Sequence, residues 1–139
     1  MDNSSKTHAK IEFDHWSDNM LEILYIINVT LIILHEIESG YEKEWELLKI
    51  PGKLTGFLLL HIPIVFMFFY GFYCIIIYPQ SKGILSIVVW IIGFIPLIVH
   101  KLIVNRKENF NKLISNIIII GNMFFGAGSI IIGILKMQK

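Results

Sequence analysis

The sequence predicts an all-α integral membrane protein, a four-helix up-down bundle whose long first helix extends out of the bilayer. The chain has 139 residues, 55% of them hydrophobic, and a mean hydropathy of +0.66, which is too apolar for an ordinary soluble domain. Polar turns separate four apolar segments, and three of these segments are long enough to cross a bilayer by themselves. Connections this short make neighbouring helices antiparallel.

The second, third and fourth spans are defined by their lack of charge. Leu54–Tyr78 covers 25 residues without Asp, Glu, Lys or Arg and includes His61. Residues 84–104 contain Lys101 as their only full charge, and Leu113–Leu135 covers 23 residues with none. Each segment meets the requirement of roughly 20 residues for a transmembrane helix.

The first span needs polar flanks, because its uncharged run, Ile23–Leu34, has only 12 residues. A span over residues 20–40 has the required length. No proline occurs between residues 20 and 49, so this helix is predicted to continue to the breaker pair Pro51-Gly52, with an acidic end outside the membrane. Residues 1–19 are predicted to be a polar interfacial segment, and residues 20–139 the transmembrane domain.

The charges and the cysteine count limit the partners and the location. A net charge of +1 gives no basic field for nucleic acid, so the expected partner is the lipid bilayer. The single cysteine, Cys74, excludes an intrachain disulfide and a cysteine-cluster metal site. Four spans place both termini on one side and the loops around residues 42–53 and 105–112 on the other, here called the loop side. The loop side has seven lysines and arginines against five, so the positive-inside rule favours a multi-pass cell-membrane protein with a cytoplasmic loop side.

Three histidines have similar predicted depths in three different spans. His61 and His100 each lie about 8–9 Å from the middle of their spans, toward the loop side, and His35 fits the same level. A site in a bundle core needs side chains at one level on facing helices. Ionisable residues inside a membrane are costly and usually mark a functional site. The sequence therefore predicts a polar centre in the bundle near the loop-side interface.

One face of the first helix is predicted to supply the partners of these histidines. At about 100° per residue, Glu38 lies about 60° and Glu42 about 20° from the direction of His35, whereas Glu36 points about 100° away. This arithmetic selects Glu38 and Glu42 over Glu36. The complete polar stripe comprises Asn28, His35, Glu38, Glu42 and Glu46.

The first chemical interpretation of the centre is a metal site. His35, His61 and His100 would ligate one transition metal such as Zn or Fe, since imidazole and carboxylate suit both metals. Glu38 or Glu42 would be a fourth ligand or the catalytic base. An enzyme of this kind would be a metal-assisted hydrolase or oxidase acting on a lipid at the interface.

The second interpretation is a hydrogen-bonded polar network that joins the helices and includes Asn28, Glu46 and Asn122. Haem held by two of the histidines is a further alternative. A network would suit a non-enzymatic small membrane subunit, an ion or proton path, or a membrane effector in which the histidines titrate. The sequence leaves the choice between enzyme and non-enzymatic protein open.

The fourth span has a face of small and polar residues, which is the usual helix-packing surface in membranes. This face is a candidate contact for a second copy of the chain or for another membrane protein. It comprises Ser115, Asn122, Gly126, Ser129 and Gly133.

Four polar motifs follow one another along residues 31–135: His35-Glu36-Ile37-Glu38, then Glu44-Trp45, then His61-Ile62-Pro63, and finally His100. This order resembles a family of small four-helix bacterial membrane proteins of unknown function. The wider group of His-x-x-Glu-Glu membrane proteins is a looser match, because Ser39 stands where the second Glu would be. The resemblance implies the four-helix architecture and the importance of these positions, and it implies no substrate.

Overall fold

The computed structural model describes residues 3–102 and 112–137. Every regular element in these ranges is helical, and four helices are long and apolar enough to cross a membrane. The predicted all-α, four-helix membrane fold is thus confirmed. The elements are α1 (Asn3–Tyr41), α2 (Glu44–Leu47), α3 (Lys53–Ile77), the 3-10 turn η1 (Pro79–Ser81), α4 (Lys82–Leu102) and α5 (Lys112–Met137).

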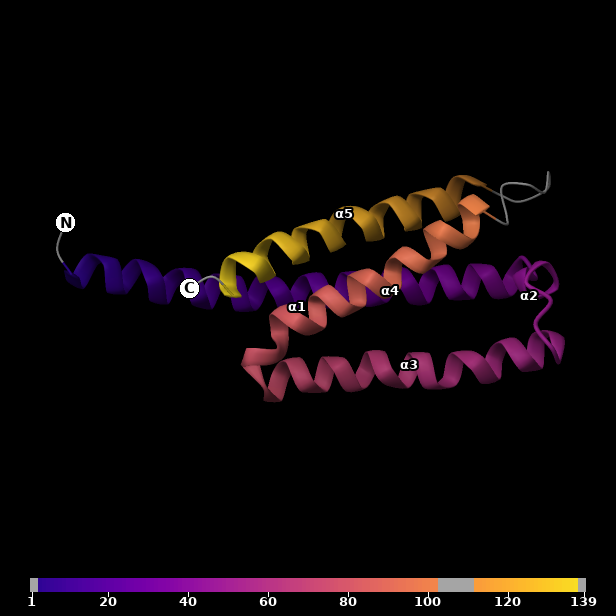
Figure 1. Cartoon of the computed structure of the whole chain (residues 1–139), viewed down its shortest axis with the longest axis horizontal. Helices are drawn as coiled ribbons and strands as arrows, with labels where there is room; N and C mark the ends of the chain where they lie inside the picture. The colour runs from indigo at the N-terminus through magenta and orange to yellow at the C-terminus, as the bar shows by residue number, and fades with distance from the viewer. Residues whose placement is uncertain (1–2, 103–111, 138–139) are drawn as a thin grey trace.

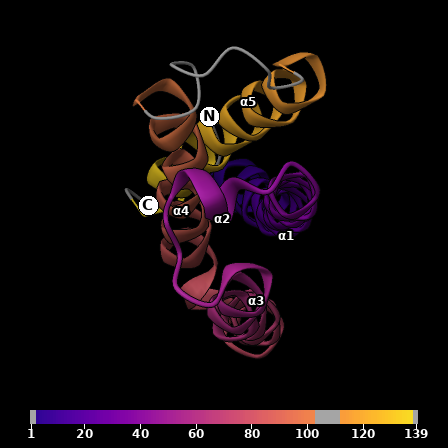
Figure 2. The same cartoon turned by 90° about the vertical axis from the view of Figure 1, so that its right-hand side faces the viewer.

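The four long helices form a core of three with one at the edge. Helix α1 runs along the whole molecule, and α4 and α5 pack closely against it and against each other (Figure 1). Helix α3 lies along the other side of α1 and α4, away from α5, as the view along the helices shows (Figure 2). Consequently α3 has fewer neighbours than the other three long helices.

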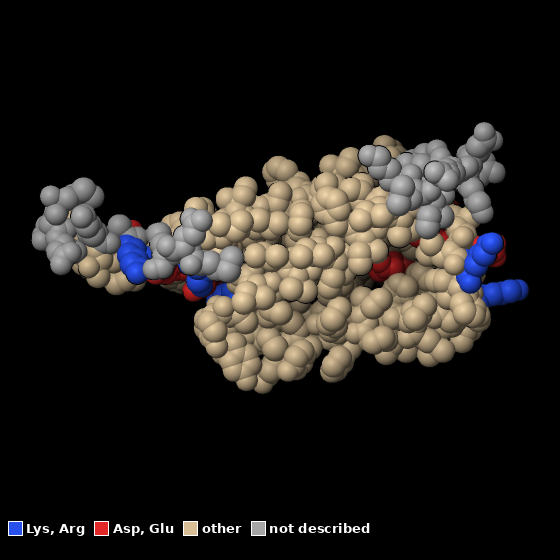
Figure 3. Space-filling view, in the orientation of Figure 1, with Lys and Arg blue, Asp and Glu red and all other residues tan. Residues whose placement is uncertain are grey.

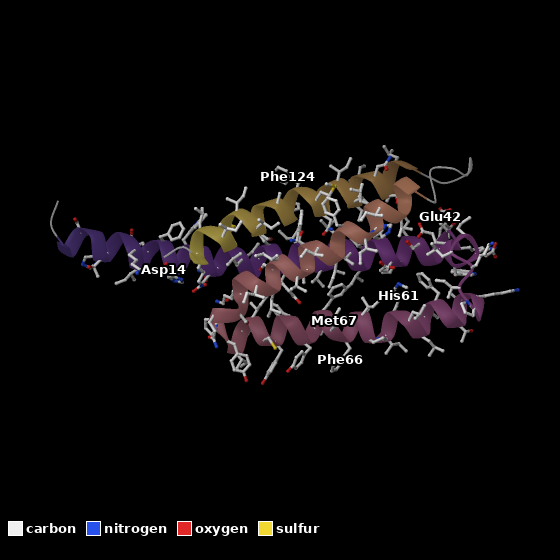
Figure 4. All side chains as sticks on the ribbon, viewed as in Figure 1. Asp14, Glu42, His61, Phe66, Met67 and Phe124 are labelled. Atoms are coloured by element: carbon white, nitrogen blue, oxygen red, sulfur yellow. The ribbon has the colours of Figure 1, made fainter. Side chains whose placement is uncertain are left out.

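Buried side chains join α3 to this core, and apolar side chains also cover the outside. Tyr25 of α1, Phe68 of α3 and Val89 of α4 belong to one buried cluster. Phe66 and Phe124 instead point away from the bundle (Figure 4) and are 69% and 74% exposed. Lipid is as apolar as these outward side chains, so such exposure is expected in a bilayer. Charged side chains gather at the two ends of the molecule (Figure 3).

The small-residue face of α5 packs inside the chain. Ser115, Asn122 and Ser129 on this face are all buried. A side chain at Gly126 would collide with Trp90 of α4, and Gly133 lies against the backbone of α4. The prediction of a helix-packing face is therefore confirmed, but α1 and α4 of the same chain cover the face that was expected to meet a second copy or another protein.

The predicted continuation of the first helix to Pro51-Gly52 is wrong. Helix α1 ends at Tyr41, and Lys43 adopts a left-handed backbone with φ 59°, through which a right-handed helix cannot continue. The short helix α2 then folds back across the loop-side end of the bundle (Figure 2). The long extension lies at the other end, where the N-terminal part of α1 projects beyond the remaining helices (Figure 1).

Two ion pairs connect α1 to its neighbours at the end of the bundle opposite α2. Lys82, at the start of α4, lies 2.5 Å from Glu22, and Lys136, near the end of α5, pairs with Asp18. The two acidic residues are four positions apart and therefore share one face of α1. These pairs join α4 and α5 to α1 at the end of the three-helix core that lies opposite α2.

Candidate functional site

A short hydrogen bond between α1 and α3 is the centre of the candidate site. His61 points from α3 toward α1 (Figure 4), and its Nε2 lies 2.6 Å from Oε2 of Glu36. The other ring nitrogen, Nδ1, lies 2.6 Å from the backbone oxygen of Phe57, one turn earlier on α3. Both side chains are largely buried, with 17% of the His61 side chain and 27% of the Glu36 side chain exposed.

The two contacts of His61 determine where its protons lie. A carbonyl oxygen only accepts hydrogen bonds, so Nδ1 carries a proton and donates it to Phe57. A bond between Nε2 and the carboxylate of Glu36 then requires one further proton between them, because two lone pairs would otherwise face each other. The contact exists either as imidazolium with carboxylate or as neutral imidazole with carboxylic acid. The pair is therefore a place where one proton is held in the membrane-spanning part of the chain.

Helix α2 covers this pair from the loop side. Glu44 is 3% exposed and Trp45 is 8% exposed, so the acidic segment after α1 belongs to the bundle. The ring of Trp45 lies 5.8 Å from that of Phe57, and the ring of Phe57 lies 4.0 Å from the imidazole of His61. These tilted ring contacts help to hold the imidazole in place.

A cavity of about 210 Å³ opens beside the pair, between α1, α2, α3 and α4. Its polar wall consists of His35, Glu36, Ser39, Glu44 and His61, and the rest of its lining is apolar, including Pro96 of α4. Figure 3 shows acidic atoms inside a hollow of the otherwise uncharged middle of the molecule. A mostly apolar cavity with a few polar groups suits an amphiphilic occupant.

His35 and His61 share this cavity, but they contact different carboxylates. Nδ1 of His35 lies 3.8 Å from Oε2 of Glu38, and Nε2 lies 3.4 Å from the hydroxyl of Ser39. His35 is 4% exposed, so it is more deeply buried than His61. Glu36 leaves the His35 face of α1 as predicted, but the selection of Glu38 and Glu42 over Glu36 as partners is wrong for His61. The direction of Glu36 leads to α3, where His61 lies.

The other predicted partners of the histidines are dispersed. Glu42 lies in the turn after α1 and Glu46 is exposed on α2, so the predicted stripe is broken where α1 ends. Asn28 donates to the Ser129 hydroxyl at 3.2 Å, and Asn122 donates to the backbone oxygen of Gly93 at 3.0 Å. These asparagines join α1 to α5 and α5 to α4 nearer the middle of the bundle.

The side chain of the third predicted metal ligand, His100, lies outside the described part of the structure. Helix α4 includes the backbone of His100, but the position of its side chain is not described. Among the described side chains, no group of three or more His, Cys, Asp or Glu residues could hold a metal ion. His61 has both ring nitrogens in hydrogen bonds, so a metal at this histidine would have to replace Phe57 or Glu36.

Helix arithmetic did not select two acidic residues of this site, Glu36 and Glu44, although both stand in the motifs on which the family resemblance rests. The sequence does contain a signal for Glu44: Gly40, at the end of the predicted span 20–40, is a residue typical of a helix C-terminus, after which the chain can fold back. It contains no comparable signal for Glu36, whose partner depends on where α3 lies around α1.

Comparison with known proteins identifies a family but no characterised relative. The model of a family of unknown function, DUF6713, matches residues 21–136. No curated protein matches the chain, and no solved structure does. The match includes α1 from Leu21 onward, α3, α4, nearly all of α5 and the whole candidate site, so any role for the site has to be inferred from its geometry.

Proposed function

Since the chain belongs to the DUF6713 family of unknown function, we propose a role from the geometry: it is a non-enzymatic, proton-responsive membrane protein. The proton shared by Glu36 and His61 holds α3 against α1. The observation that carries this proposal is the pair of 2.6 Å contacts at the two nitrogens of His61. Histidine is the side chain whose charge most readily changes near neutral pH.

Because α3 is only weakly attached to the other helices, the shared proton has a large influence on where α3 lies against α1. Away from the pair, the described residues join α3 to α1 by apolar packing and by one hydrogen bond, from the Tyr25 hydroxyl to the backbone oxygen of Phe68 at 2.8 Å. While Nδ1 keeps donating its proton to Phe57, removal of the shared proton leaves the lone pair of Nε2 facing the Glu36 carboxylate, so the attraction at the loop-side end becomes repulsion. Helix α3 would then move away from α1 there and widen the cavity.

Other ionisable groups near the pair affect its response. Glu44 faces it from α2, and His35 faces the same cavity from α1. The described lining residues of α4 are apolar.

The test is a distance measurement between α1 and α3 as pH changes. Spin labels at Tyr41→Cys and Leu59→Cys, in a Cys74→Ser background, occupy exposed positions outside the cavity lining. In bilayers we expect the distance between the labels to increase as pH rises. Glu36→Gln should remove this response and keep the distance short at every pH, because a Gln amide donates to a neutral imidazole without a shared proton.

Glu38→Gln is the matched control. Glu38 lies on the same helix and is also largely buried, but it faces His35. This variant should keep the wild-type response to pH. If the distance in the wild type does not change with pH, or if Glu38→Gln and Glu36→Gln behave alike, the proposal is contradicted.

The two occupied nitrogens of His61 favour this role over the metal-dependent enzyme. Elemental analysis of protein purified without chelators is therefore expected to show no stoichiometric transition metal. Near-stoichiometric Zn or Fe that disappears in His61→Ala would contradict the proton-sharing pair and favour a metal centre. Such a centre would supply Lewis-acid chemistry for a lipid substrate.

A further inference from the structure

A second hollow follows the seam between α1 and α3, which lie side by side (Figures 1 and 2), and its described lining comes from these two helices alone. It has two stretches, of about 330 Å³ and 250 Å³, which share Ile33 and Phe68. Ile37, Leu58 and Phe69 in this lining are more than half exposed, so the hollow opens to the outside of the bundle. This hollow, here called the outer groove, therefore faces the hydrocarbon of the bilayer.

The outer groove is long enough for an extended lipid chain. Ile26, Ile33 and Gly40 line it at intervals of seven residues and so lie along one stripe of α1. At the rise of an α-helix, the groove from Ile26 to Gly40 is ~21 Å long. The hydrocarbon core of a bilayer is about 30 Å thick, so the groove follows α1 through most of that depth.

One end of the outer groove carries a hydrogen-bond acceptor. Glu36 and His61 line the stretch that ends at Gly40. Oε2 of Glu36 shares the proton with His61, and no described residue hydrogen-bonds to Oε1. Oε1 only accepts hydrogen bonds, whichever partner holds the shared proton. The pair with its proton is neutral, so this end of the groove suits an uncharged donor such as a hydroxyl group.

The side chains along the groove favour a flexible chain over another helix. Helices in membranes approach one another closely through small residues. Ile33, Phe68 and Phe72 instead give this groove large side chains along its length. The small-residue face of α5 packs against α4 of the same chain, with Gly133 beside Gly83. A single alkyl chain can follow the spaces between large side chains, whereas a helix needs a smooth, small-residue surface.

We infer that the outer groove binds a single-chain lipid alcohol. The hydroxyl donates to Oε1 of Glu36, and the alkyl chain lies between α1 and α3 toward Tyr25 and Phe72. A hydroxyl without a partner in hydrocarbon is costly, so this bond selects an alcohol over an unsubstituted chain. The inference goes beyond the proposed function, because it uses Oε1, whereas the proton is shared through Oε2.

The probe is hexadecanol with a photoreactive diazirine in the middle of its chain. The full chain is reconstituted in phosphatidylcholine vesicles and irradiated, and mass spectrometry locates the adducts. We expect saturable labelling on the groove-lining residues of α1 and α3. Excess hexadecanol should compete with the probe. Hexadecyl methyl ether should not compete at equal concentration, because it has the same chain but cannot donate a hydrogen bond.

Variants of Glu36 test the hydroxyl contact. Glu36→Leu removes the acceptor and should raise the probe concentration for half-maximal labelling about tenfold. Glu36→Gln should label like the wild type, because its amide donates to a neutral His61 and its carbonyl oxygen still accepts. The same Glu36→Gln change should abolish the pH response of the spin-label distance. Labelling and the pH response can therefore fail separately.

A matched pair of substitutions tests the position of the chain. Ile33→Trp fills the groove where its two stretches meet and should abolish saturable labelling. Leu34→Trp adds the same bulk at the next residue, which is exposed and lines neither stretch, and should label like the wild type. Equal labelling of the two variants would place the probe elsewhere and overturn the inference.

The remaining outcomes identify other occupants. Equal competition by hexadecanol and its methyl ether would show ordinary contact with lipid chains and would overturn the inference alone. Ile37→Cys, in a Cys74→Ser background, provides a test for a second copy at the exposed edge of the groove. Disulfide-linked dimers of this variant, together with no labelling of the wild type, would assign the groove to another copy of the chain and contradict a lipid alcohol.

Discussion

At the scale of single residues, the site depends on which carboxylate meets His61. Helix arithmetic separated Glu36 from Glu38 by direction, and the structure agrees that the two leave α1 on different sides. Glu38 lies beside His35, while Glu36 reaches α3. The angle was therefore predictable from the sequence, but the neighbour found at that angle was not.

Glu36 and His61 should contribute jointly, and not independently, to the free energy of unfolding. His61→Ala leaves Glu36 without its partner in a largely buried place, which is expected to cost about 1–3 kcal/mol. Glu36→Ala should have a similar cost. The double variant should be less destabilised than the sum of the two, because both single changes remove the same contact.

Reversible unfolding in mixed micelles, titrated with a denaturing detergent, measures these free energies. His15→Ala is the control, since His15 is an exposed histidine of α1 far from the site, and it should stay within about 0.5 kcal/mol of the wild type. Strict additivity of His61→Ala and Glu36→Ala would show that the two side chains do not support each other.

At the scale of elements, α3 is positioned by a close approach to α1. Gly71 lies where a Cβ atom would collide with the hydroxyl of Tyr25, which donates to Phe68 one turn earlier on α3. The sequence predicts α3 as a span but gives no sign that this glycine is a contact point, because an apolar run looks the same on every face. The face of α3 that meets α1 is decided by packing.

Gly71→Ala should loosen α3 by forcing the Tyr25 hydroxyl away from Phe68. The expected loss is about 1 kcal/mol, near the upper part of the range measured for hydrogen bonds between membrane helices. In a Tyr25→Phe background, the same Gly71→Ala change should cost less, since the hydroxyl that it meets is already gone. Thermal unfolding in bilayers measures both differences, and equal costs in the two backgrounds would argue against this contact.

At the scale of the whole molecule, the fold requires both chain ends on one side of the bilayer and α2 on the other. Exposed Ser5 and Glu46 mark these two sides. In a Cys74→Ser background, an impermeant maleimide should label Ser5→Cys and Glu46→Cys from opposite sides of sealed vesicles. The positive-inside rule further predicts that Glu46→Cys reacts from the cytoplasmic side. Labelling of both cysteines from one side would be incompatible with four crossings.

By itself, the sequence determined how many helices are long and apolar enough to cross a bilayer and roughly where they lie, because this property depends on the length and polarity of one segment at a time. It also identified His35 and His61 as candidate site residues, because ionisable groups are rare within apolar segments. Only the tertiary structure decided that α1 ends at Tyr41 and that Glu44 returns to the bundle. It alone paired Glu36 with His61, because a contact between residues 25 positions apart depends on how one helix lies against another, and no periodicity within a single helix specifies that arrangement.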